Sequence, residues 1–492
     1  FYTAMEELLQ VHGQTGEDPT EPPRSKPYPY PALQHEPEIE RFSRSLRRQG
    51  LHPFHTPNAL NISTQADRAA VTTADGCPDE TGMKSDAENR LLLPALSDGV
   101  KILTGAEVTR LITSPDGRKI VAAEARHAGR SIRINAKTFA LAGGAVNSAA
   151  LLLRSGGDAH PEGLANSSGL LGRNYMVHNS TFFVGVNPLR TNPTKWQKTL
   201  GLNDFYEAGP GTRFPLGNLQ MLGKLQAPML KPARPWAPTW ALKLMAARSL
   251  DVYLTTEDLP SRDNRVRVDG DRILIDWTPT NLAPHHELVR RVTRAVRKAG
   301  SPLVFTQRMG IETNSHMCGT AVAGHDPTRS VLDPLCRSHD VENLWLADSS
   351  FFPSSAALNP ALTIGANALR MRLQSFVLAA RAAVRPGRPG DPRRAGRAGH
   401  GHLAARPRLR PGRHAGRARR CRGDRPRRAG SRRSGCWTAA AAPFKIFPQK
   451  CRWKFSFFSN CFLVYKYYNK SDIALNAGKC RPEDHRRNTD YE

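Results

Sequence analysis

The chain has 492 residues, enough for several domains, but its composition differs between two parts. Its formal net charge is +28 at pH 7, yet residues 1–375 hold 42 basic and 36 acidic side chains, whereas residues 376–492 hold 29 and 7. The excess positive charge therefore belongs to the C-terminal part. The average charge gives no reason to class the whole chain as a nucleic-acid-binding protein.

Cysteine spacing and hydropathy exclude several other classes. The eight cysteines include no CxxC pair and no clustered Cys/His spacing, so we expect neither a disulfide framework nor a metal site. Residues 1–13 lack the features of a signal peptide, and the apolar stretch Phe455–Tyr465 is too short to cross a bilayer. We therefore predict no transmembrane segment.

Residues 1–60 are rich in proline and charge, which predicts an extended connector interrupted by a short helix over about Pro37–Gln49. The apolar spacing from Asp86 to Leu96 predicts a helix, and Val100–Leu103 a strand. A β-ribbon should follow, because three short segments rich in Val, Ile and Thr are separated by turn residues: Glu107–Ile112, Lys119–Arg126 and Ser131–Ile134.

Thr138–Ala142 predicts a strand that runs through Gly143-Gly144 into a helix over Ala145–Leu153. A glycine turn at a helix N-terminus is where a doubly wound sheet binds phosphate. Many strand-to-helix turns carry glycine only for packing, and taken alone this motif favours packing.

The region between residues 178 and 310 should be α+β with antiparallel strands. Leu250–Thr256 predicts a strand, and Asn264–Val268 with Arg272–Trp277 predicts a hairpin. An apolar stripe from Leu288 to Val296 indicates a helix that ends at Gly300.

The sequence changes character after about residue 373. Residues 376–435 contain 19 Arg and no Lys, and neither they nor residues 436–492 show sustained periodicity, so we expect a disordered tail over 374–492. Two explanations stay open: a cationic arm that contacts phosphates, or GC-rich DNA read out of frame. The second is favoured.

The most informative segment begins at His316-Met317-Cys318-Gly319-Thr320 and ends at Asn359-Pro360-Ala361-Leu362-Thr363. In order and spacing it resembles the C-terminal signature of the glucose-methanol-choline (GMC) flavoprotein oxidoreductases, and the resemblance extends over roughly residues 1–373. Bacterial sugar and polyol dehydrogenases are the members most similar in appearance. Between its two ends the segment contains Asp326-Pro327, Ser330-Val331-Leu332-Asp333, Asn343-Leu344, Asp348-Ser349-Ser350 and Pro353.

The resemblance implies FAD as cofactor and His316 and Asn359 as the catalytic pair. Oxidation of an alcohol needs a base within hydrogen-bond reach of the hydroxyl, which suits histidine. A second polar group must hold the same oxygen, which suits an amide. Without the signature, the simpler interpretation of His316 is a core histidine. For Asn359 it is a helix N-cap that precedes Pro360 at the first helical position.

Five further residues are assigned to the cofactor by resemblance: Val108, Asp348, Ser349, Pro360 and Thr363. The helix beginning at Pro360 would aim its N–H groups at the flavin, together with Thr363. Asp348 could instead only cap a turn, and Val108 only pack in a strand. We interpret three other histidines as structural or solvated and Cys318 as a packing residue: His178, His325 and His339.

The chain contains no Gly-x-Gly-x-x-Gly run, which in the family binds the cofactor pyrophosphate. We therefore expect that a piece on the order of 150 residues is missing upstream. The predicted fold is α/β plus α+β, with an incomplete Rossmann-like FAD-binding domain interleaved with an antiparallel-sheet substrate domain. The expected divisions are a connector, the rest of the FAD-binding domain, a substrate-domain part, the C-terminal domain and the tail: 1–60, 61–177, 178–249, 250–373 and 374–492.

The predicted function is FAD-dependent oxidation of a CH–OH group in a small alcohol, sugar or polyol, by a truncated fragment of such an enzyme. The electron acceptor stays open between oxygen, a quinone and a cytochrome. The alternative is a non-catalytic remnant, or a nucleic-acid-binding protein that uses its Arg-rich tail. A nucleic-acid partner is not expected.

Overall fold

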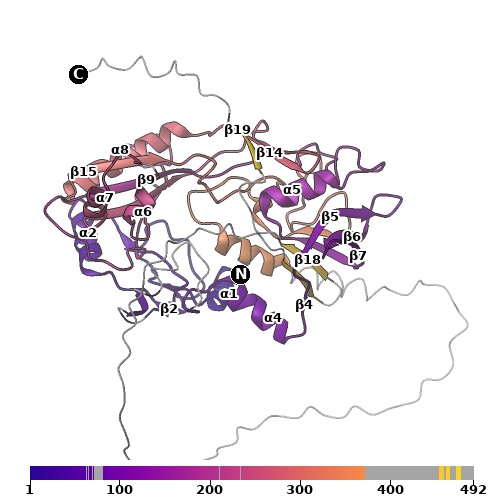
Figure 1. Cartoon of the computed structure of the whole chain (residues 1–492), viewed down its shortest axis with the longest axis horizontal. Helices are drawn as coiled ribbons and strands as arrows, with labels where there is room; N and C mark the ends of the chain where they lie inside the picture. The colour runs from indigo at the N-terminus through magenta and orange to yellow at the C-terminus, as the bar shows by residue number, and fades with distance from the viewer. Residues whose placement is uncertain are drawn as a thin grey trace, which may run out of the picture. The chain divides into compact units, whose positions relative to one another are not determined.

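The structure is a computed structural model that describes residues 1–371 apart from 63, 65, 69, 71–80, 210 and 233, together with the backbone of 454–458, 461–465 and 473–477 (Figure 1). The rest of the predicted tail lies outside the described residues. Among the residues that are described, no helix is long and apolar enough to span a membrane.

The largest sheet has six strands, all paired antiparallel, as the sequence predicted for the substrate domain. Its one face packs against two helices, α2 (Pro37–Arg47) and α8 (Leu282–Lys298), in a core that includes fully buried Phe183 and Leu254. In order across the sheet, the strands are β15 (Leu303–Arg308), β9 (Asn179–Val186), β12 (Ser249–Thr256), β11 (Asn218–Met221), β10 (Leu200–Leu202) and β3 (Phe54–His55).

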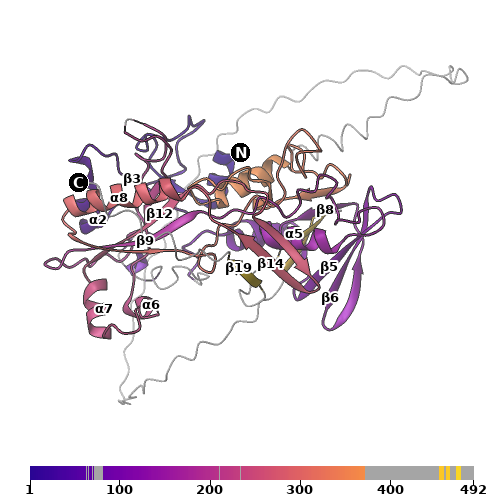
Figure 2. The ribbon, with the colours of Figure 1, turned by 90° about the horizontal axis from the view of Figure 1, so that it is seen from above.

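Residues 222–248 leave this sheet between β11 and β12 and form α6 (Ala227–Leu230) and α7 (Thr239–Ala246). Figure 2 shows α6 and α7 on the opposite side of the sheet from α2 and α8. The excursion therefore lies on the side of the sheet that α2 and α8 do not cover.

A second sheet has mixed strand directions and contains the predicted glycine turn. β8 (Thr138–Leu141) lies parallel to β16 (Leu344–Leu346) and leads into α5 (Gly144–Arg154), as predicted. The other neighbour of β8 is β18 (Cys461–Tyr465), which pairs with β17 (Lys454–Phe458), and β17 pairs with β4 (Lys101–Ile102). The sequence analysis predicted no strands within the tail.

The predicted ribbon and hairpin are confirmed. The ribbon is β5 (Ala106–Thr113), β6 (Ile120–His127) and β7 (Arg130–Ile134), and the hairpin is β13 (Arg265–Asp269) and β14 (Arg272–Trp277). Gly270 occupies the hairpin turn with φ 57°, which glycine adopts without strain. β14 also pairs with β19 (Ile473–Ala477).

The remaining elements are short. The helix predicted near residue 90 is a π-helical turn, η1 (Glu88–Leu92), followed by α4 (Leu93–Ser97), and neither has a fully buried residue. The N-terminal region holds α1 (Tyr2–Leu9), β1 (His12–Gly13) and β2 (Tyr30–Pro31), and η2 (Ser349–Phe351) and a helix over residues 361–371 follow β16.

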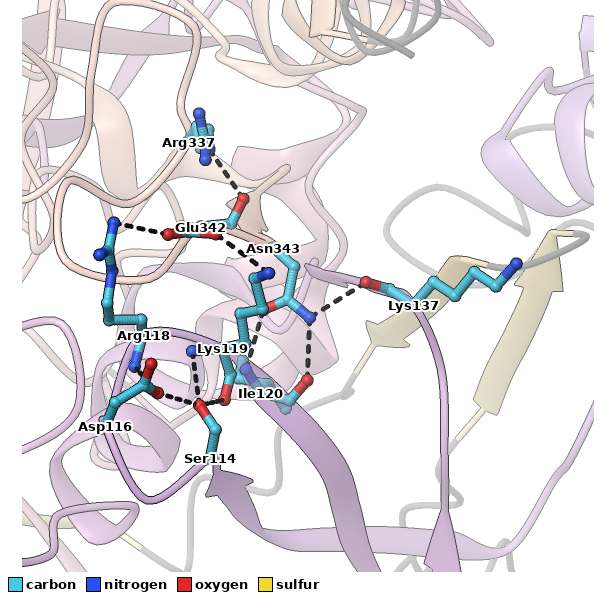
Figure 3. A network of polar contacts seen from close by, with 9 residues as sticks. All are labelled: Ser114, Asp116, Arg118, Lys119, Ile120, Lys137, Arg337, Glu342 and Asn343. Carbon is cyan, nitrogen blue, oxygen red and sulfur yellow. Dashed lines mark hydrogen bonds and ion pairs between the residues drawn. The ribbon is translucent and has the colours of Figure 1, made fainter. Parts of the chain in front are cut away.

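Asn343 of the sequence signature has a structural role. Its amide oxygen accepts from the Ile120 N–H at 2.8 Å, and its NH2 group donates to the carbonyls of Ile120 (2.8 Å) and Lys137 (3.0 Å) (Figure 3). The neighbouring Glu342 carboxylate pairs with Arg118 at 2.7 Å. Together they join β6 to the segments that begin β8 and β16.

Candidate active site

His316 lies on the loop after β15, half-buried beside a second histidine. The rings of His316 and His178 meet edge to face, with centroids 4.8 Å apart and planes at 76°. Burial lowers the pKa of His316 to about 4, so its imidazole is neutral at pH 7. Its Nδ1 is buried and has no hydrogen-bond partner among the described residues.

His178 connects His316 to the loop that precedes Asn359. It is buried just before β9, and its Nδ1 donates to the Ala356 carbonyl at 3.0 Å. Burial and then the neighbouring His316 lower the pKa of His178 to about 3, which keeps it neutral. From the sequence, His178 was expected to be structural or solvated. Its contact with His316 was not predicted, because no local motif indicates it.

Asn359 is exposed, and a residue of the six-stranded sheet orients its amide. Gln220 on β11 donates from Nε2 to Asn359 Oδ1 at 3.0 Å, which leaves the Asn359 NH2 group available as a donor. The helix begins at residue 361, and the Pro360 carbonyl accepts from the Ile364 N–H. The expected helix start at Pro360 is thus one residue early, and Asn359 is not the N-cap.

The His316 loop is held from two sides. Cys318 and Met176 exchange backbone hydrogen bonds at 2.9 and 3.1 Å, and the Ser349 hydroxyl donates to the Met317 carbonyl at 2.7 Å. Cys318 packs with Met176 and Phe352, and burial raises the pKa of its thiol. A packing role for Cys318 is therefore supported.

The Asp348 carboxylate accepts four hydrogen bonds from residues of the same chain. Its carboxylate accepts from the Gly144 N–H (3.0 Å), the Ser148 hydroxyl (2.5 Å) and the Ser350 N–H (2.9 Å) and hydroxyl (2.6 Å). It caps η2 and also lies at the N-terminus of α5, where a phosphate would otherwise bind. This arrangement favours the packing interpretation of the Gly143-Gly144 turn.

The residues that the family resemblance assigns to the cofactor lie in two places. Val108 lines a cavity together with Gly143 and Ser148, next to the Asp348 cluster, which agrees with a ligand end being held there. Thr363 exchanges a 2.9 Å hydrogen bond with the Tyr2 hydroxyl on α1. The Val108 cavity could hold one end of the cofactor, whereas the sequence contains no glycine-rich phosphate loop.

The other histidines singled out from the sequence lie apart from this site. His339 Nε2 is within hydrogen-bond distance of the Ser330 hydroxyl (3.0 Å) and the Gly324 carbonyl (3.1 Å), and His325 is exposed. In the part of the chain that the structure describes, no three His, Cys, Asp or Glu side chains gather as metal ligands would.

Comparison with known proteins gives consistent matches. Two family models, both described as GMC oxidoreductase, match residues 32–180 and 260–368. The chain is 31% identical over 395 residues to a 6'''-hydroxyparomomycin C oxidase of Streptomyces lividus, covering 75% of this chain and 69% of that one. It is 32% identical to a paromamine 6'-oxidase of Streptomyces fradiae (65% and 61% covered) and 26% identical to a fructose dehydrogenase large subunit of Gluconobacter japonicus (75% and 71%).

Solved structures share the fold. A pyridoxine 4-oxidase from Mesorbium loti aligns with a TM-score of 0.51 at 20% identity, covering 75% of this chain and 72% of that one. A formate oxidase aligns with a TM-score of 0.50 at 14% identity, covering 69% and 71%.

Proposed function

This chain belongs to the GMC oxidoreductase family, and from that premise we propose that His316 and Asn359 are its catalytic pair in the oxidation of a sugar or polyol alcohol. FAD is the cofactor, and the reaction is oxidation of a CH–OH group in a small molecule. The observation that carries the assignment is the geometry of His316, whose ring meets His178 and whose buried Nδ1 has no partner among the described residues.

The two side chains divide the work at the substrate hydroxyl. His316 takes the hydroxyl proton, which its neutral ring can accept. The Asn359 NH2 group donates a hydrogen bond to the same oxygen, because Gln220 already holds the other end of the amide. FAD, when bound, supplies the acceptor for the hydride. His178 fixes the His316 ring against the loop that ends at Asn359.

The face of the six-stranded sheet that carries Gln220, opposite the α2 and α8 core, is polar and suits a polyhydroxylated substrate. Beside Gln220 it carries Tyr253, whose hydroxyl bonds to Ser180 Oγ at 2.8 Å, and Thr255, which bonds to the Ala357 carbonyl at 2.6 Å. The relatives named for paromamine, fructose and 2-methyl-1,2-propanediol support the same class for this chain.

Four side chains are proposed to contact FAD: Val108, Ser349, Pro360 and Thr363. Asp348 is proposed to contact it through its main chain, because its carboxylate already accepts four hydrogen bonds. The domain limits given from the sequence are likewise kept as proposals. A Thr363→Val substitution should weaken FAD binding in a flavin-fluorescence titration. An unchanged dissociation constant would remove Thr363 from the cofactor site.

The test of the function is a substrate screen on the chain reconstituted with FAD, using an artificial electron acceptor. Amino sugars, ketohexoses and short diols should each be tried, with anaerobic bleaching of the flavin absorbance as a second readout. At least one sugar or polyol should be oxidised, and His316→Ala should slow the reaction by about 10²- to 10⁴-fold. Flavin that binds but is never reduced by any of these alcohols would contradict the proposal.

A further inference from the structure

The α6–α7 excursion has a small core of its own and an unusual outer surface. Ala227, Ala237 and Leu242 are buried together, with Leu230 and Met245 packed against them. The excursion projects from the face of the sheet opposite α8 (Figure 2). The two short helices therefore stabilise each other and leave their outer sides uncovered by the described residues.

Large apolar side chains occupy that outer side. Trp236 is 79% exposed, Trp240 70%, Met229 61% and Leu244 48%. Trp240 and Leu244 are four residues apart and share one side of α7, whereas Leu242 and Ala246 are buried on the other. Two tryptophans exposed to this degree on one projection mark an interaction surface.

The charge of the excursion has one sign. Residues 222–248 contain no acidic residue and five basic ones: Lys224, Lys231, Arg234, Lys243 and Arg248. Of these, Lys224 is mostly buried and pairs with Asp251 at 3.8 Å, so the others supply the surface charge. Lys243 is exposed next to Leu244. Arg248 donates to the Pro188 carbonyl at 3.1 Å, which ties in a loop whose Leu189 is 95% exposed and whose Arg190 is also exposed.

We propose that this α6–α7 surface, formed by Met229, Trp236, Trp240, Lys243 and Leu244, binds an anionic phospholipid membrane and lies in its interfacial plane. Tryptophan and leucine enter the boundary between headgroups and acyl chains, while basic side chains meet the lipid phosphates. The exposed Lys243 beside the indoles, with no acidic residue in the excursion, is complementary to an anionic lipid surface.

Prolines restrict the backbone of this surface. Pro228, Pro232, Pro235 and Pro238 punctuate the excursion, and each fixes its own φ angle. The backbone that carries the exposed side chains therefore has less conformational entropy before binding, and less is lost when it binds.

The test is flotation of the full 492-residue chain with vesicles of phosphatidylglycerol and phosphatidylcholine, and with vesicles of phosphatidylcholine alone. The Trp236→Ala/Trp240→Ala variant should bind the anionic vesicles about tenfold more weakly than wild type. Phe305→Ala, which removes an exposed aromatic residue from the sheet edge, should bind like wild type. Because the Arg-rich tail is present in every variant, it cannot account for a difference between them.

A second readout reports insertion directly. Brominated lipids should quench the tryptophan fluorescence of the wild type, and the double variant should lose most of that quenching. An unchanged thermal midpoint by circular dichroism would show that the exposed indoles were removed without unfolding. Equal flotation of the two proteins would overturn the proposal, and so would a wild-type dimer that the double variant dissociates, or capture by an acidic protein without any binding to vesicles.

Discussion

The six-stranded sheet and the mixed sheet differ in how far apart in the chain their strands originate. Five strands of the first lie between residues 179 and 308, and only the two-residue β3 comes from elsewhere. The mixed sheet combines β4, β8 and β16 with β17 and β18, from residues 101 to 465. The sequence also lacks the glycine motif of the cofactor side. The six-stranded sheet, proposed here as the substrate side, is therefore built mostly from one segment. The mixed sheet, proposed as the cofactor side, depends on pairing between segments that are far apart in the chain.

The largest effect is expected where the two sides meet. His316→Ala should lower kcat/KM by about 10²- to 10⁴-fold, because the substitution removes the proton acceptor. The measurement is steady-state turnover with an artificial acceptor, and the exposed His325→Ala is the matched control. A His316→Ala enzyme with near wild-type turnover would place the base elsewhere.

A matched pair of phenylalanines compares the stability of the two sides. Phe139 on β8 and Phe183 on β9 are both fully buried, so replacing either by alanine should lower the free energy of unfolding by about 3–5 kcal/mol. Added FAD should raise the thermal midpoint of Phe139→Ala more than that of Phe183→Ala, since ligand binding stabilises the side that holds it. Equal responses in calorimetry would show that the two sides unfold as one unit.

Acid should destabilise the chain through its buried histidines. His285 lies between Thr181 and Thr256 under the sheet, and burial lowers its pKa to about 4, while the pKa of His178 falls to about 3. A lowered folded-state pKa contributes stability that is present above the unfolded value near 6.5 and is lost as the pH falls toward 4 and 3. At pH 5 each histidine should cost about 2 kcal/mol. Urea midpoints at pH 7.5 and pH 5 measure the loss, and His285→Gln should reduce it.

Gln220→Ala should have the smallest effect, roughly tenfold on kcat, because Asn359 stays in place but its amide is free to rotate. The exposed Gln226→Ala is the control. KM should change less than kcat if Gln220 only positions Asn359. A rise in KM with kcat unchanged would instead make Gln220 a substrate-binding residue.

Local signals were sufficient for much of the fold. The β13–β14 hairpin has a turn signal at Asp269-Gly270 and strict alternation, and α5 follows a glycine turn, so both could be predicted within a few residues. The edges of the large sheet could not. β10 has three residues and β3 has two, and their pairing at Leu200 and His55 depends on contacts far apart in the chain.

The candidate site likewise contains residues that the sequence predicts and residues that only tertiary structure brings to the site. His316 and Asn359 stand in an ordered signature, so their positions were available from the sequence. His178 and Gln220 were not, because each reaches the site through tertiary structure: the Met176–Cys318 bridge brings His178 to His316, and sheet register brings Gln220 to Asn359. The N-cap alternative for Asn359 was reasonable locally but is wrong, because its side chain bonds to the sheet.

The contact between α1 and the helix over residues 361–371 has a consequence for the order of folding. Tyr2 bonds to Thr363, and a Cβ at Gly365 would lie within 3.1 Å of the Met5 side chain, so the first and last helices of the described N-terminal part are packed together. During synthesis α1 leaves the ribosome long before its partner exists. Contacts of such large sequence separation form slowly. The helix that follows Asn359 is thus expected to dock last, and the enzyme to gain its active site only in the closing step of folding.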